Sequence, residues 1–198
     1  NLGDFGNGTE VIEGVKPKKN KLFIDLVHQL DEIDDIERFR ISSIEPNLLT
    51  NEIIEFVAQS KRFVPHFHIP LQSGNNKILS AMRRRYKREL YADRIKQIKH
   101  LMPHCCIGVD VIVGFPGETH EDFMETVHFI ESLDVSYLHV FTYSERLNTP
   151  ASEMEQAVPM HTRRLRNETL TELSEIKRKA FYQKHQGESR PMLVEHGH

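Results

Sequence analysis

The sequence has 198 residues, of which 38% are hydrophobic and 28% are charged, a composition typical of one globular domain with room for the start of a second. No apolar run approaches the ~18 residues of a membrane span, and the adjacent Cys105 and Cys106 exclude a disulfide framework and a paired Cys-x-x-Cys metal site. The net charge of -3 excludes a uniformly basic nucleic-acid binder.

Helix-like and strand-like patterns of apolar residues alternate along the chain. The spacing predicts helices over residues 20–34, 51–60, 77–82, 88–102, 119–133 and 161–186, and strands over 38–44, 65–71, 106–115 and 137–143. The run at 106–115 is rich in Val and Ile, which is typical of a strand buried on both faces.

This alternation predicts an α/β fold with a parallel sheet and helical crossovers, either a (β/α) barrel or a doubly wound sheet. An eight-fold barrel typically needs ~250 residues, so four whole strands indicate part of a barrel. Because the chain starts at Asn1 rather than at Met, we expect a fragment or a processed piece. We expect a barrel core over residues 1–188, truncated at its N-terminal strand or strands, and the first strand of a further module over 189–198.

The carboxyl ends of the predicted strands are small, polar or rich in Gly and Pro. Ligands of parallel α/β folds bind beyond these ends, so the five ends are candidates for one pocket, with ordinary turn chemistry as the alternative for each. The ends lie at residues 1–4, 42–46, 68–74, 113–118 and 142–146.

Three features near these ends carry charge or possible metal ligands. Asp110 interrupts an apolar strand, and a buried carboxylate needs a partner, so either a structural partner such as an arginine or a ligand role is expected. His66 and His68 face the same side of a strand, but no third ligand is suitably spaced, so we expect no metal site. Arg84, in a run of three arginines, is placed to clamp a carboxylate or phosphate at the pocket rim.

Two further segments suggest contacts with a nucleotide or with RNA. Residues 114–119 match neither a P-loop nor a dinucleotide fingerprint, but the glycine-rich strand end suits the edge of an adenine. Residues 161–190 hold eight Lys and Arg against four acidic residues, whereas residues 1–160 hold 18 against 24. The basic helix is either a solvated face or a strip that meets a phosphate backbone, and composition alone does not decide.

Four motifs occur in an order that resembles the radical S-adenosylmethionine (SAM) methylthiotransferases, over roughly residues 1–190. They are Pro-Leu-Gln-Ser-Gly at 70–74, Met-Arg-Arg-Arg-Tyr at 82–86, the segment 110–119, and Tyr-Ser followed by Thr-Pro-Ala at 143–151. Residues 1–6, 42–46 and 138–141 look most like the branch that acts on threonylcarbamoyladenosine in tRNA. The branches that act on isopentenyladenosine or on an aspartate of a ribosomal protein look less similar.

The resemblance implies a partial, six-stranded (β/α) barrel in a cytoplasmic, non-membrane tRNA-modifying transferase. Such enzymes carry a second iron–sulfur cluster in an N-terminal domain and an RNA-binding C-terminal β-barrel. Their radical [4Fe–4S] cluster is held by a Cys-x-x-x-Cys-x-x-Cys loop, takes an electron from a donor and cleaves SAM to a 5′-deoxyadenosyl radical. That radical removes a hydrogen atom, and a methylthio group is added to the modified adenosine next to the anticodon.

The resemblance also assigns roles to residues of this chain. The implied SAM-binding positions are Asn1 at the amino group, Gln72 and Ser73 near the ribose, Arg84 at the carboxylate, Val113, Gly114, Phe115, Pro116 and Gly117 at the adenine edge, and Ser43 and Glu45 in the lining. The resemblance places Tyr143 and Ser144 on the far, substrate side of the pocket. Asp110, from its place in the strand, is a further candidate for the substrate pocket, and Arg163, Arg164 and Arg166 of the basic helix are the candidate RNA contacts.

The sequence departs from the family at its cysteines. No Cys-x-x-x-Cys-x-x-Cys is present, so no catalytic residue is identifiable and we expect this chain alone to bind neither cluster and to be inactive. Three other functions stay open: a radical SAM enzyme with a small-molecule substrate, a non-catalytic module that binds RNA through the basic helix, and a phosphate-binding aldolase or isomerase barrel. The last would need a lysine or paired acids, and the strand ends offer Glu45, Glu118 and Glu145 but no lysine.

Overall fold

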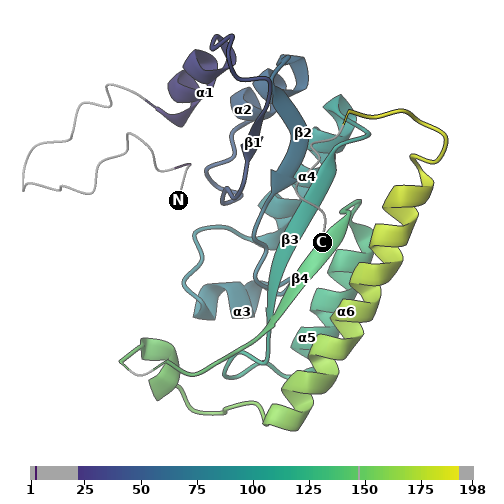
Figure 1. Ribbon diagram of the computed structural model, residues 1–198. Coiled ribbons are helices and arrows are strands. Elements are labelled where there is room, and N and C mark those ends of the chain that lie inside the picture. Colours follow the sequence, from purple (N-terminus) through teal and green to yellow (C-terminus); the bar gives the residue numbers. More distant parts are fainter. Residues whose placement is uncertain (1–2, 4–21, 147, 192–198) are drawn as a thin grey trace, which may run out of the picture.

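The computed structural model describes Gly3, residues 22–146 and residues 148–191, in which helices and strands alternate as the sequence predicts (Figure 1). The elements are α1 (Phe23–Asp31), β1 (Phe39–Ile41), α2 (Asn51–Gln59), β2 (Phe63–His68), α3 (Asn76–Ala81), α4 (Arg88–Leu101), β3 (Cys106–Val113), α5 (His120–Ser132), β4 (Tyr137–Thr142), the short 3₁₀ helix η2 (Pro150–Glu153) and α6 (Met160–Gln183). The six predicted helices and the four strands predicted between residues 38 and 143 are confirmed, with ends that differ by a few residues. The further strand expected over 189–198 falls largely outside the described residues and stays a prediction. None of the described helices has the length and apolar character to cross a membrane.

The four strands form one parallel sheet in the order β1-β2-β3-β4. Each strand pairs with the next in the chain after a crossover that contains a helix, which is the arrangement of a (β/α) barrel segment. The α/β class and the partial barrel are therefore confirmed for the described residues. All strands run the same way, so their carboxyl ends meet at one edge.

The two faces of the sheet differ in what covers them. Val109, Val111 and Leu138 are buried in the hydrophobic core that the sheet shares with the helices. On the other face of the same strands, Asp110 is half-buried and His139 is exposed. The prediction that residues 106–115 are buried on both faces is therefore wrong for this part of the chain, because side chains of a strand alternate and only one face packs on helices.

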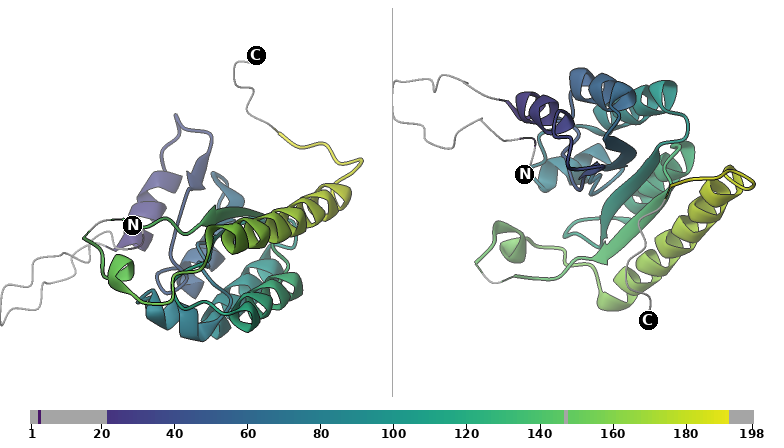
Figure 2. Two further views of the ribbon diagram at one scale, coloured as in Figure 1. Left: turned by 90° about the horizontal axis from the view of Figure 1, so that it is seen from below. Right: turned by 45° about the horizontal axis from the view of Figure 1, so that its top comes forward.

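Helix α6 covers the outer edge of β4, as two turned views also show (Figure 2). Ser174 Oγ accepts a hydrogen bond from the Leu138 N–H at 2.8 Å and donates one to the Leu138 carbonyl at 3.0 Å. Asn167 Nδ2 donates to the Val140 carbonyl at 3.1 Å. These side chains satisfy backbone groups that an edge strand would otherwise leave unpaired.

A buried ion pair fastens α6 to the end of β3. Glu118 Oε2 accepts hydrogen bonds from Arg166 Nη1 at 2.5 Å and from the Gly114 N–H at 2.7 Å. Burial raises the pKa of Glu118, while the Gly114 N–H and the Arg166 charge act in the opposite direction. Gly114 has a φ of 77° and Arg163 packs directly over its Cα, so a side chain there would be both strained and blocked.

We expect Glu118→Gln to lower the free energy of unfolding by about 3 kcal/mol, since it leaves a buried guanidinium without its counter-charge. Urea denaturation measures this loss. The matched control is Glu121→Gln, at an exposed position in the first turn of α5, which should change stability by less than ~0.5 kcal/mol. Equal effects of the two substitutions would show that the pair does not hold α6 in place.

Candidate functional site

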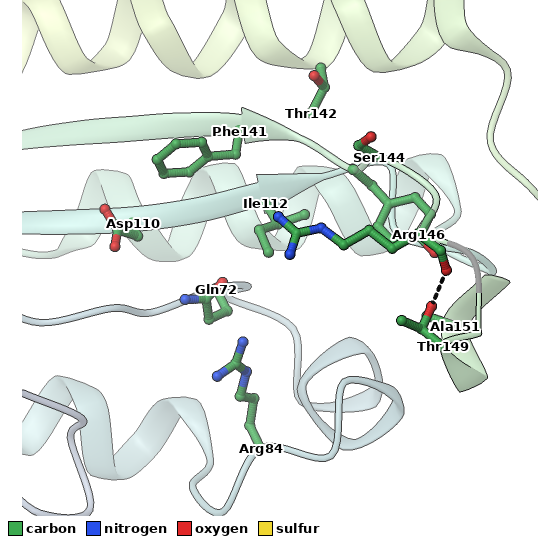
Figure 3. Close-up of a pocket in the computed structure, with 11 residues that line it drawn as sticks. Gln72, Arg84, Asp110, Ile112, Phe141, Thr142, Ser144, Arg146, Thr149 and Ala151 are labelled. Atoms are coloured by element: carbon green, nitrogen blue, oxygen red, sulfur yellow. Dashed lines mark hydrogen bonds between the residues drawn. The ribbon is translucent and has the colours of Figure 1, made fainter. Parts of the chain in front are cut away.

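A pocket of about 630 Å³ opens at the carboxyl ends of β2, β3 and β4 (Figure 3). Its volume lies in the range of sites for small molecules and cofactors. It is lined by Gln72, Arg84, Asp110, Ile112, Phe141, Thr142, Tyr143, Ser144, Arg146, Thr149 and Ala151. Five of the residues singled out from the sequence meet here, namely Gln72, Arg84, Asp110, Tyr143 and Ser144.

Gln72 sits at the base of the pocket in an uncommon backbone conformation, with a φ of 69°. Its N–H donates to the Asp110 carbonyl at 2.8 Å and its carbonyl accepts from the Ile112 N–H at 3.0 Å, so β3 holds it firmly. Its side-chain Oε1 is buried and has no hydrogen-bond partner among the described residues. A strained backbone that aims an unsatisfied polar atom into a pocket is typical of a ligand contact.

Two guanidinium groups enter the pocket from opposite walls, Arg84 from the segment after α3 and Arg146 from the segment after β4 (Figure 3). Arg84 Nε is buried without a partner in the described structure, and its Nη1 lies 3.7 Å from Glu45 Oε1. Glu45 therefore stands beside the pocket as a partner of Arg84. A pocket with two cations and few compensating acids suits an anionic ligand.

Tyr143 forms the far wall and is held from behind. Its ring packs edge-on against Phe115, with centroids 5.4 Å apart, and the Arg163 guanidinium lies 5.4 Å from its centre. Its hydroxyl is buried and has no partner among the described residues. The hydroxyl is thus a further buried polar atom without a partner in a residue that lines the pocket.

Several predicted cofactor contacts do not line the pocket. Ser43 is exposed at the end of β1, and Asn1 lies outside the described residues. Ser73 is fully buried, where its hydroxyl lies 3.2 Å from Thr126 Oγ1 of α5. Ser73 therefore fixes the loop after β2 rather than facing a ligand.

The interpretation of residues 113–117 as an adenine edge stays a prediction, and several backbone groups of this segment have partners within the fold. The Val113 carbonyl accepts from the Tyr143 N–H, the Gly114 N–H donates to Glu118, and the Gly117 N–H donates to the Gln156 carbonyl. Val113, Gly114, Phe115 and Pro116 are buried, and Gly117 lines a separate, smaller depression. The hydrogen bond from Tyr143 to Val113 and the packing of Phe115 against the Tyr143 ring show that this segment supports the wall of the pocket.

Two of the three predicted RNA contacts are also corrected. Arg163 is 3% exposed and donates to the carbonyls of Val158 and Tyr143 as well as to Glu145, and Arg166 is 6% exposed and bound to Glu118. Guanidinium groups paired inside the fold cannot reach a phosphate backbone. Arg164 is exposed, so its role as an RNA contact stays a prediction.

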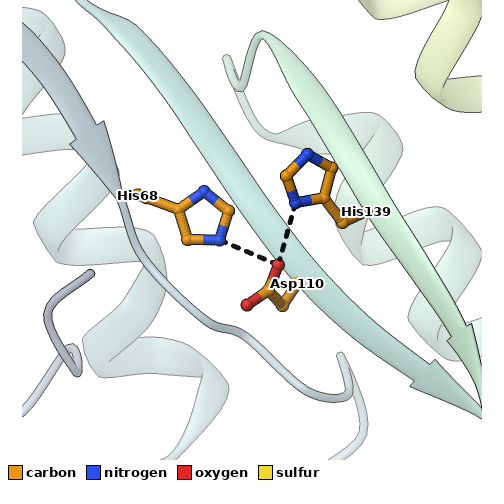
Figure 4. A group of neighbouring side chains, drawn as sticks. All are labelled: His68, Asp110 and His139. Atoms are coloured by element: carbon orange, nitrogen blue, oxygen red, sulfur yellow. Dashed lines mark hydrogen bonds and ion pairs between the residues drawn. The ribbon is translucent and has the colours of Figure 1, made fainter. Parts of the chain in front are cut away.

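Asp110 is paired with two histidines rather than with an arginine. Its Oδ1 lies 2.8 Å from His68 Nε2 and 3.3 Å from His139 Nδ1 (Figure 4). Burial opposes ionisation of Asp110, but the hydrogen bonds and charges of the two histidines outweigh it and hold its pKa below the usual value.

The sequence offered no third ligand for His66 and His68, whereas in the described residues His68 lies in a different group, with Asp110 and His139, whose ligand atoms are all within 4.8 Å of one another. His66 is not part of this group: its Nε2 lies 3.3 Å from the Tyr137 hydroxyl. Sequence spacing missed His139 because the three side chains come from three different strands. The sequence did hold one signal for His139. It lies two and four residues before Phe141 and Tyr143, and such alternate positions of a strand share one face.

Neither cysteine suits an iron–sulfur cluster. Cys105 is fully buried, and burial raises the pKa of its thiol to about 12. Burial also raises the pKa of Cys106, and the pair lies at the amino end of β3, opposite the pocket. The residues of this chain therefore do not fit the cluster that the resemblance implies, since cluster ligation needs several accessible thiolates.

The Radical SAM superfamily model matches residues 8–130 of this chain. The chain is 42% identical, over 98% of its length, to the threonylcarbamoyladenosine tRNA methylthiotransferase MtaB of Bacillus subtilis (strain 168), of which it covers 45%. It is 37% identical, over 87% of its length, to the tRNA-2-methylthio-N(6)-dimethylallyladenosine synthase of Desulfitobacterium hafniense (strain Y51), of which it covers 39%. The chain thus spans less than half the length of these curated relatives.

Among solved structures, coproporphyrinogen III oxidase (HemN) from Escherichia coli, described as a radical SAM enzyme, superposes with a TM-score of 0.56. The match covers 70% of this chain and 32% of that chain at 17% sequence identity. At this identity the likeness supports the fold alone. It agrees with the parallel sheet and helical crossovers described above.

We expect anaerobic incubation of this chain with iron and sulfide to leave no stoichiometric [4Fe–4S] cluster, because two poorly ionised thiols at the wrong end of the sheet cannot hold one. Iron and sulfide analysis after desalting, with the absorption spectrum, measures the outcome. A Cys105→Ala/Cys106→Ala variant should give the same background. A stoichiometric cluster that this double variant abolishes would contradict the expectation.

Proposed function

The chain belongs to the radical SAM superfamily, and from this premise we propose that it is the SAM- and substrate-facing barrel segment of a tRNA methylthiotransferase. The observation that carries the proposal is the 42% identity to a threonylcarbamoyladenosine tRNA methylthiotransferase over nearly the whole chain. The proposed reaction adds a methylthio group to N(6)-threonylcarbamoyladenosine next to the anticodon. The tRNA partner, an electron donor and a cytoplasmic location are parts of the same proposal.

The pocket residues fit SAM by their unsatisfied groups. Gln72 Oε1 and Arg84 Nε are buried and have no partner among the described residues. In the proposed complex the Arg84 guanidinium binds the SAM carboxylate, and Gln72 accepts a hydrogen bond from a ribose hydroxyl. When bound, SAM supplies the methyl group and the hydrogen-abstracting chemistry of the superfamily.

The chain's own contribution is binding and orientation. Glu45 holds the Arg84 side chain in place, the β3 backbone fixes Gln72, and Phe115 with Arg163 supports the Tyr143 wall. Side chains held by such contacts lose little freedom when a ligand binds, which favours affinity and a defined ligand position. Cluster ligands are not among the described residues, so this segment orients the ligands of a reaction that needs a cluster supplied by other residues.

The charge of the pocket favours threonylcarbamoyladenosine over its main alternative. A threonylcarbamoyl group ends in a carboxylate, whereas the isopentenyl group of the alternative substrate is apolar and uncharged. Arg146 faces the pocket opposite Arg84, so one guanidinium is available to SAM and another to a substrate carboxylate. The alternative is retained because relatives named for the dimethylallyl substrate are 36–38% identical to the chain.

Other functions have less support. A non-catalytic module that binds RNA through α6 would need the helix's arginines at the surface, and Arg163 and Arg166 are buried. Action on a ribosomal protein or on a small molecule has less support, because the relatives reported above are named for the modification of tRNA.

We expect Arg84→Ala to weaken SAM binding roughly 10- to 100-fold, the effect of losing a hydrogen bond to a charged group. Isothermal titration of the full chain with SAM measures the affinity. The matched control is Arg85→Ala, which removes an exposed guanidinium next in sequence and should bind SAM as the unaltered chain does. Unchanged affinity in Arg84→Ala would contradict the assignment of this residue.

The substrate is tested by nucleoside analysis of tRNA from a strain that lacks the gene. We expect the methylthio group to disappear from threonylcarbamoyladenosine while the threonylcarbamoyl group stays, and re-expression of the intact gene to restore it. Mass spectrometry of digested tRNA measures both nucleosides. Loss of the methylthio group from isopentenyladenosine instead would overturn the substrate assignment and leave the transferase class intact.

A further inference from the structure

We propose that His68, Asp110 and His139 form a binding site for one divalent transition-metal ion on the exposed face of the sheet. Ligand atoms of the three side chains lie within 4.8 Å of one another, and Asp110 Oδ1 is 2.8 Å from His68 Nε2 and 3.3 Å from His139 Nδ1. Figure 4 shows the two imidazoles converging on the carboxylate from either side. The proposal concerns a site separate from the iron–sulfur cluster and does not depend on the proposed function.

The sheet itself brings the three side chains together. Asp110 of β3 pairs in register with His139 of β4, and His68 of β2 pairs with Gly108, two residues before Asp110. Residues two apart on a strand share a face, so all three side chains project from the same side. Ligands on adjacent hydrogen-bonded strands are held more rigidly than ligands on loops.

Gly108 leaves the space that this arrangement needs. A Cβ at Gly108 would lie 2.8 Å from His68 Nδ1 and would collide with the Tyr137 hydroxyl. Because glycine has no side chain, the His68 ring can lie across this position and reach Asp110. The gap at Gly108 is therefore part of the construction of the site.

The donor set and its spacing match those of known metal sites. Two imidazoles and one carboxylate are common ligands of Zn²⁺ and Fe²⁺ sites that keep at least one open position. Bonds of about 2.0–2.1 Å in tetrahedral geometry place ligand atoms roughly 3.3 Å apart, which the two separations from Asp110 Oδ1, 2.8 and 3.3 Å, approach, while all ligand atoms lie within 4.8 Å of one another. The ionised carboxylate supplies the negative charge that a divalent ion requires.

The open coordination position would face the pocket. Asp110 lines the pocket, and the His139 side chain is 54% exposed, so an ion and a further ligand can reach the group. That further ligand would be water or an oxygen or nitrogen atom of a molecule in the pocket. The competing explanation is that Asp110 only pairs with the two histidines, with no affinity for metal.

The test titrates the full chain with Zn²⁺ by calorimetry and with Co²⁺ by visible absorption. All proteins carry His196→Ala and His198→Ala, which remove the closely spaced histidines near the C-terminus that could bind metal on their own. We expect one ion per chain, a cobalt spectrum with a low-symmetry d–d band, and a thermal midpoint that rises with added Zn²⁺. Absence of stoichiometric binding in this protein would overturn the proposal.

Two variants assign the ligands. Asp110→Asn keeps the shape of the carboxylate without its charge, and His139→Ala removes a half-exposed ring, so neither should prevent folding. Each should weaken metal binding at least roughly tenfold, the scale on which even outer-sphere contacts act. The control His128→Ala alters an exposed histidine on α5 and should bind like the parent. Equal affinity in all three variants would show adventitious binding and contradict the site.

Discussion

The position of α6 depends on a carboxylate buried between a strand end and a helix. Glu118 accepts hydrogen bonds from the Gly114 N–H and from Arg166, which joins the turn after β3 to the first half of α6. Removing Glu118 and Arg166 from water is costly, and their direct contact offsets this cost through two hydrogen bonds from Arg166 Nη1, to the Glu118 carboxylate and to the Glu118 carbonyl. Arg166 Nε is buried and has no partner among the described residues. Through this link, Arg163 comes to lie over Gly114 and behind Tyr143, so the wall of the pocket is set by a helix that contributes none of its lining.

The same link explains why a basic helix is not a simple basic surface. Arg163 and Arg166 contribute to the positive balance of residues 161–190, yet both satisfy acceptors inside the fold. On the opposite side of the sheet the charge is arranged for ligands. Arg84 and Arg146 enter the pocket, and Asp110, which also lines it, pairs with His68 and His139. Net charge along a sequence therefore says little here about where charge is accessible.

The open face of the sheet brings together two kinds of site that share Asp110. The pocket groups Gln72, Arg84 and Tyr143 carry unsatisfied polar atoms and suit an organic anion. The proposed metal group lies beside them on three strands whose register holds its ligands together. An ion there would place a positive charge next to the space assigned to SAM and substrate. The two proposals therefore concern one continuous surface but have separate tests.

The sequence by itself determined the order of helices and strands, the parallel α/β class, and five residues of the pocket, because periodicity and strand-end chemistry are local. It did not determine which polar groups are already paired. Ser73, Gly114 and Arg166 look like ligand contacts in the sequence. In the fold, Thr126 is the partner of Ser73, and Glu118 is the partner of both Gly114 and Arg166. Thr126 is far from Ser73 along the chain, and Glu118 is far from Arg166. The partnership of His68, Asp110 and His139 was decided by strand register. Register follows from packing of the whole sheet against its helices, and no segment encodes it alone.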